Sequence, residues 1–113
     1  MSEKKQYETT KDDITDIFKT VGMSYGYARE NIEVDFRRFS DFKVRWERSY
    51  TWVNFHIGYQ MQYAPVWFIT EIAHRFFASF KGEKLEMSEN AKSWVDCNKW
   101  KWHKGIVPEE ITE

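Results

Sequence analysis

The sequence predicts an α+β fold, in which an antiparallel sheet of about three strands packs against a central helix. Two patterns of apolar residues lead to this prediction. Between residues 32 and 59, three short runs alternate apolar with polar side chains, which is the spacing of strands with one buried face. Residues 65–81 instead place apolar side chains over more than half of a helix, as expected for a helix that packs against a sheet.

A short amphipathic helix is predicted before the sheet. Apolar residues recur at helical spacing between residues 14 and 21. Thr10 is a suitable N-cap, acidic residues follow in the first turn, and Gly22 is placed to end the helix. Residues 23–30 are predicted to form a loop.

The three alternating runs each predict a strand with one apolar face. Polar residues between the runs, such as Ser40 and Asp41, are typical of turns. The residues expected to share the buried face are Ile32, Val34 and Phe36 in the first run, Phe42, Val44 and Trp46 in the second, and Thr51, Val53, Phe55, Ile57 and Tyr59 in the third.

The central helix is predicted to begin at Pro65, which is tolerated in a first helical turn, and to end at Gly82. Ser88 is placed to cap a last short helix. The apolar residues expected to occupy more than half of the circumference of this helix are Trp67, Phe68, Ile69, Ile72, Ala73, Phe76, Phe77 and Phe80. The predicted division of the chain is a flexible N-terminus (1–9), a single domain (10–97) and a tail rich in Trp and Lys (98–113).

Composition narrows the class of protein. The 17 basic and 18 acidic residues give a net charge of -1, which argues against a general binder of nucleic-acid backbones. Cys97 is the single cysteine, so no internal disulfide can form. No apolar run approaches the ~20 residues of a membrane span, and we expect a soluble, cytoplasmic protein. Aromatic residues make up 19% of the chain, too many for so small a core, which favours an exposed aromatic surface and a partner.

The segment from residue 69 to residue 78 carries a residue pattern close to that of a zinc-peptidase helix. In such a helix, two His one turn apart bind the metal and a Glu after the first His acts as general base. Here His74 occupies the first ligand position, but Arg75 stands at the position of the base and Ala78 at the second ligand. We therefore expect no catalytic residue and no bound zinc at this helix.

Two segments carry a resemblance to a known family. Residues 41–52 resemble the RWGSC-type strand turn of the SprT-like branch of small HExxH metallopeptidases, and residues 64–74 resemble the Pro-led helix that ends in their metal motif. The likeness spans residues 32–95 and is closest to an archaeal group. It implies a related fold with a degenerate site: only His74 matches a ligand, and the third His would fall near Lys84.

Three residues outside the missing zinc positions are candidates for a different metal site. Glu71 and His74 are one helical turn apart, and with His56 from the third strand they form a candidate metal site of two His and one Glu. A His74 that is hydrogen-bonded to Glu71 or to the sheet is the more common arrangement.

Basic and aromatic side chains interleave in the strands. Arg45, Arg48, Tyr50 and Trp52 are a candidate sheet face for stacking bases and pairing phosphates. Acidic residues on the same strands, such as Glu47, neutralise this charge, so ion pairs across the strands are the competing explanation.

The tail alternates lysine with tryptophan. Lys99, Trp100, Lys101 and Trp102 have the period of an edge strand or a docking peptide, so we predict that they bind a partner. The alternative is that the tail folds back and buries both Trp in its own domain.

These observations favour a non-catalytic, metallopeptidase-like domain that serves as a protein-interaction module or as an accessory subunit of a larger complex. The expected partner is another protein or a second copy of the chain. Two alternatives stay open: a metal-dependent hydrolase with an atypical His/Glu site, and a small nucleic-acid-binding adaptor. No cofactor, membrane or small-molecule substrate is expected.

Overall fold

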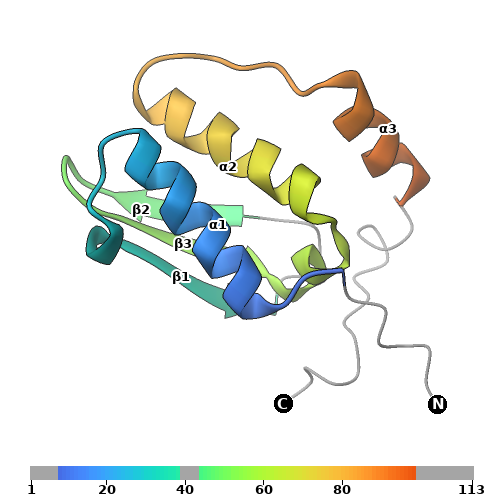
Figure 1. Cartoon of the computed structure of the whole chain (residues 1–113), viewed down its shortest axis with the longest axis horizontal. Helices are drawn as coiled ribbons and strands as arrows, with labels where there is room; N and C mark the ends of the chain where they lie inside the picture. Colours follow the sequence, from blue (N-terminus) through green and yellow to red (C-terminus); the bar gives the residue numbers. More distant parts are fainter. Residues whose placement is uncertain (1–7, 39–43, 99–113) are drawn as a thin grey trace.

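The computed structural model describes residues 8–38 and 44–98 of the chain, and these form two layers (Figure 1). Helices α1 and α2 lie side by side on one face of a three-stranded sheet, and α3 packs against α2. The α+β fold, with three strands and a central helix, is therefore confirmed. The elements are α1 (Lys11–Ser24), β1 (Ile32–Arg37), β2 (Val44–Arg48), β3 (Val53–Gly58), α2 (Val66–Phe80) and α3 (Glu89–Cys97), with 3-10 turns at Arg29–Asn31 and Tyr59–Tyr63.

The sheet is mixed, so the prediction of an antiparallel sheet is wrong for one of its two strand pairs. The strand order is β1-β3-β2: β2 runs antiparallel to β3, and β1 runs parallel to it. Alternation of apolar residues specifies which face of a strand is buried, but it carries no information on strand direction or order. Both β1 and β2 are edge strands of the described sheet.

The core lies between the sheet and the two helices. Phe55 at the centre of β3 has no exposed surface, and its ring lies 4.7 Å from Phe18 of α1 and 5.5 Å from Phe77 of α2. The predicted buried face of β3 is confirmed at Val53, Phe55 and Ile57, all at 0% exposure. Thr51 was expected to share it, but lies exposed in the turn after β2.

Helix α1 begins as predicted but does not end at Gly22. The Thr10 side chain accepts a hydrogen bond from Asp13 N (3.0 Å), and Asp13 accepts one from Thr10 N (3.2 Å), which is a capping box. The helix continues to Ser24 and stops at Gly26, whose φ of 99° a residue with a Cβ rarely adopts. Gly22 instead allows a close approach, because a Cβ there would overlap Ile32 Cδ1 and lie 2.6 Å from Phe77 Cζ.

Helix α2 has the predicted stop at Gly82, whose φ is 88°. The amides of Gly82 and Glu83 donate to the carbonyls of Ser79 and Ala78, at 3.0 and 2.9 Å, in the pattern of a Schellman motif. Pro65 is the N-cap and not the first helical residue. Trp67 was expected on the apolar surface of this helix, and it is 46% exposed.

Two residues of the predicted N-terminal segment 1–9 contact the rest of the domain. The amides of Glu8 and Thr9 both donate to Gln62 O, at 2.8 and 3.2 Å, and the Thr9 hydroxyl donates to Ala64 O at 3.3 Å. These hydrogen bonds join Glu8 and Thr9 to the segment between β3 and α2. Among the residues that the structure describes, no helix has both the length and the apolar character that crossing a membrane requires.

Candidate functional site

The three positions of the degenerate zinc motif have separate structural roles on α2. His74 lies against α1, with its Nδ1 3.2 Å from the hydroxyl oxygen of Tyr25. Ala78 is fully buried, and the Arg75 side chain reaches the segment after α2, where its Nε donates to Leu85 O at 3.0 Å. The neighbour of His74 is thus Tyr25, the residue that follows the last turn of α1, which the sequence analysis did not consider.

Glu71 holds the start of α3. Its two carboxylate oxygens accept hydrogen bonds from the backbone N–H and the hydroxyl of Ser88, both at 2.7 Å. The Ser88 hydroxyl oxygen in turn accepts from Ala91 N, as the predicted cap of α3. The Glu71 carboxylate therefore has a structural role in fixing α3 to α2.

His56 lies on the opposite face of the sheet from α2. It alternates with Phe55 and Ile57, which face the helices, and its ring nitrogens contact two carboxylates: Nδ1 lies 2.8 Å from Asp35 Oδ1, and Nε2 lies 3.2 Å from Glu47 Oε2. The sheet therefore separates His56 from both residues of α2.

The structure accordingly does not bring the candidate ligands His56, Glu71 and His74 together. Across residues 8–38 and 44–98, no group of three His, Cys, Asp or Glu side chains is arranged to hold a metal ion. Successive side chains of a strand point to opposite faces of the sheet, and this strand parity could have excluded the site from the sequence alone. A helix that packs on Phe55 cannot also face its neighbour His56.

Among the described residues, one acid on the face of the sheet opposite the helices has a perturbed pKa. Slight burial acts to raise the pKa of Asp35, but hydrogen bonds from Arg37 and His56, and the attraction of their charges, leave this pKa below its ordinary value. The same contact with Asp35 raises the pKa of Arg37. These residues join β1 to β3, so the arrangement is a cross-strand charge cluster.

The predicted basic and aromatic sheet face is not a single surface. Arg45 is three residues before Arg48 on β2, so the two side chains emerge on opposite faces. Arg48 lies over the ring of Phe80 on the helix side, 4.5 Å from its centroid. Tyr50 and Trp52 lie beyond the end of β2, in the turn to β3, where Tyr50 is 96% exposed. The predicted partner-binding residues Lys99, Trp100, Lys101 and Trp102 lie outside the described residues.

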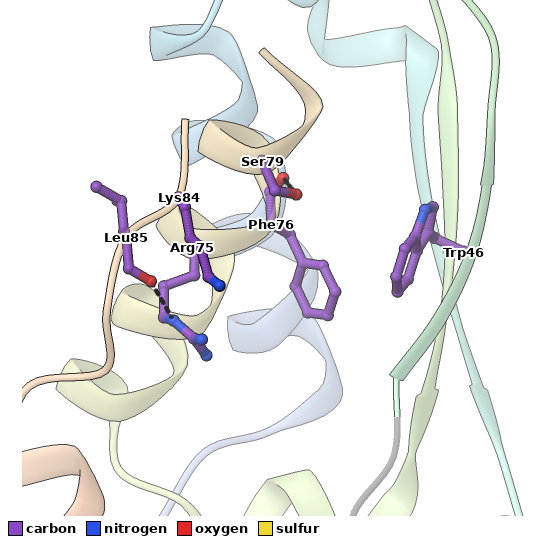
Figure 2. Close-up of a pocket in the computed structure, with 6 residues that line it drawn as sticks. All are labelled: Trp46, Arg75, Phe76, Ser79, Lys84 and Leu85. Carbon is purple, nitrogen blue, oxygen red and sulfur yellow. Dashed lines mark hydrogen bonds between the residues drawn. The ribbon is translucent and has the colours of Figure 1, made fainter. Parts of the chain in front are cut away.

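The structure contains a groove that the sequence analysis missed. It lies between edge strand β2 and the C-terminal half of α2, with the segment after α2 as its outer rim (Figure 2). Its volume is about 240 Å³. The residues that line it, called here the β2–α2 groove, are Trp46, Arg75, Phe76, Ser79, Lys84 and Leu85.

One side of the β2–α2 groove is aromatic and the other is cationic. The rings of Trp46 and Phe76 meet edge to face with centroids 5.0 Å apart. Figure 2 shows Arg75 and Lys84 on the side away from Trp46, with Phe76 between. In the part of the chain that the structure describes, neither cation forms an ion pair. Lys84 and Leu85 fall in a non-helical segment without periodicity, so no sequence pattern marked them.

Comparisons of the chain with models of protein families, with curated proteins and with solved structures found no match.

Proposed function

We propose that this protein is a non-catalytic interaction module, or accessory subunit, that holds an extended segment of a partner protein in the β2–α2 groove. The observation that carries the proposal is the position of Trp46. This side chain is 44% exposed and projects from an edge strand over a hollow, although its ring packs on Phe76 of α2. Exposed aromatic side chains beside a hollow are typical anchors of protein interfaces.

The open edge of β2 supports binding by strand addition. In the described sheet, β2 pairs with β3 on one side, and no strand covers its other side. An extended segment that pairs with such an edge gains main-chain hydrogen bonds, and adjacent pockets select alternate side chains. The groove lies directly beside this edge, because Trp46 is the central residue of β2.

The size of the groove favours a side chain over a free ligand. Pockets for drug-sized molecules have volumes of ~300–1,000 Å³, whereas this groove has about 240 Å³. One or two side chains of a bound segment fill such a volume. The rest of the contact then comes from the strand edge.

The other functions have less support. A hydrolase with a His/Glu metal site is disfavoured by the separation of His56 from His74 across the sheet. A nucleic-acid adaptor is disfavoured because Arg45 and Arg48 do not share a face. Descent from SprT-like metallopeptidases and action in the cytoplasm remain part of the proposal, on the sequence grounds given above.

The test is a selection of random peptides displayed on phage against the full chain, followed by binding assays on variants. We expect the selected peptides to lose binding to Trp46→Ala, and also to Ser79→Trp, which fills the groove without removing a buried side chain. Trp67→Ala is the matched control, because Trp67 is 46% exposed but lies outside the groove. Selected peptides that bind Trp46→Ala and Ser79→Trp as tightly as the parent would refute the proposal, as would a selection that yields no binder.

A further inference from the structure

We infer that the segment held in the β2–α2 groove is acidic, with a carboxylate side chain two residues from a large apolar one. This inference rests on the proposed function, and it names the chemistry of the partner. Its basis is the pair of cations, Arg75 and Lys84, on the same side of an otherwise aromatic groove.

Arg75 is held in place with part of its binding capacity unused. Its Nε donates to Leu85 O at 3.0 Å, which fixes the half-buried side chain against the segment after α2. A guanidinium has five N–H donors in a planar fork, so the outer ones stay available for a carboxylate. A cation that is already positioned loses little conformational freedom when it binds an anion.

The charges around the groove leave this pair uncompensated. Glu83 and Glu86 flank Lys84 and Leu85 in the chain, yet neither forms an ion pair with Arg75 or Lys84 within the described residues. The nearby Glu71 carboxylate is engaged by Ser88. An anion between Arg75 and Lys84 could therefore form a charge-assisted hydrogen bond with either of them.

The spacing of the bound side chains follows from an extended segment. Alternate residues of a strand point to the same face, about 7 Å apart. One residue can then stack on Trp46 and Phe76 while the residue two positions away reaches Arg75 and Lys84 on the other side (Figure 2). A polyanion such as a nucleic acid is less suited, because Glu83 and Glu86 would repel its neighbouring phosphates.

The experiment compares two peptides with blocked, uncharged ends that differ only in one side chain, Glu or Gln. The probes are acetyl-Ser-Phe-Ser-Glu-Ser-amide and its Gln counterpart, titrated into the isotope-labelled full chain and followed by the shift of the Trp46 indole N–H. At low salt, the Glu peptide should bind about tenfold tighter than the Gln peptide, as a charge-assisted hydrogen bond of ordinary strength implies. Added salt should reduce this preference.

Variants of the protein test which residues cause the preference for the Glu peptide. We expect Arg75→Gln with Lys84→Gln to reduce the ratio of the two affinities to about one. Lys81→Gln removes the same kind of charge close by but outside the groove, since Lys81 lies over the Tyr27 ring, and it should keep the preference.

Three results would overturn the inference. Equal affinity for the Glu and Gln peptides at the groove refutes the acidic partner and leaves the proposed function standing. No shift at Trp46 with either peptide argues against the groove as a peptide site altogether. Tighter binding of a single-stranded oligothymidine, lost in the Arg75→Gln and Lys84→Gln variant, would assign the groove to nucleic acid.

Discussion

The Nδ1 atom of His74 lies 3.2 Å from the hydroxyl oxygen of Tyr25, so the one residue that matches a zinc ligand instead joins α2 to α1. The two rings also meet edge to face with centroids 5.7 Å apart. A histidine whose nitrogen is engaged by a tyrosine in this way acts in packing between the helices. This relationship changes what a substitution of His74 is expected to do.

We predict that His74→Ala lowers the free energy of unfolding by about 1 kcal/mol, the net value of one ordinary hydrogen bond, and leaves metal content unchanged. Urea denaturation and elemental analysis of untagged protein check the two parts. Tyr25→Phe is the control, because it removes only the hydroxyl and should cost a similar amount. About one equivalent of zinc in the parent that disappears in His74→Ala would contradict the prediction and restore a metal site.

Of the two glycines near the C-terminal end of α1, Gly22 and Gly26, Gly22 is predicted to be the harder to replace. In Gly22→Ala, the added methyl group would overlap Ile32 Cδ1 and press on the Phe77 ring, and overpacking of this kind costs about 1–3 kcal/mol. Gly26→Ala offers a comparison at the same end of the helix, because its Cβ would meet no atom within 4 Å and only the positive φ opposes it. Thermal melts of both variants should show the larger loss at Gly22.

Neighbouring phenylalanines of α2 are predicted to differ in role. Phe77 has no exposed surface and packs on Tyr27 and Phe55, so Phe77→Ala should lose about 3–5 kcal/mol of stability. Phe76 is only partly buried and lines the groove, so Phe76→Ala should cost less and should weaken peptide binding. Chemical denaturation gives the order, and equal losses would mean that Phe76 belongs to the core.

Much of the fold was predictable because its signals are local. Alternation identified the buried face of β3, and the chemistry of glycine placed the end of α2 at Gly82. The role of Gly22 could not be predicted, because the close approach depends on where Ile32 and Phe77 come to lie.

The candidate site was also predictable only in part. His56 could have been excluded from a site on α2 by strand parity alone. The groove could not have been found, because it depends on β2 lying at the edge of the sheet and on a non-periodic segment returning past α2. Strand order and loop path are properties of the whole chain and leave little trace in a single sequence.

Glu71 is predicted to hold α3 in place. Removing its carboxylate in Glu71→Ala leaves the Ser88 N–H and hydroxyl without this partner, and the loss of a hydrogen bond of this kind costs about 1 kcal/mol. The effect should be local, because α3 keeps its contact between Trp94 and Phe68, whose rings lie 4.5 Å apart. Hydrogen exchange should therefore accelerate in residues 89–97 and stay unchanged in α1. Uniform acceleration would show that Glu71 supports the whole domain.

The cluster at Asp35 predicts how stability changes in acid. The pKa of Asp35 is lower in the folded chain than its ordinary value of 3.8, because the hydrogen bonds and charges of Arg37 and His56 outweigh the effect of slight burial. Above the ordinary value the carboxylate is charged in both states, and its contribution is fully present. As the pH falls, the unfolded chain takes up the proton first, so stability is lost until the pH has passed through the folded pKa.

Asp35→Asn should therefore flatten the loss of stability as the pH falls through and below 3.8, measured by urea denaturation at a series of pH values. Glu33→Gln is the matched control, because Glu33 is an exposed acid of the same strand, two residues away, and forms no ion pair within the described residues. The change at Asp35 should be modest, since the carboxylate is largely solvated and salt screens its partners. If Glu33→Gln flattened the profile as much as Asp35→Asn, the acid sensitivity would come from the net charge of the strand and not from the contacts of Asp35 with Arg37 and His56.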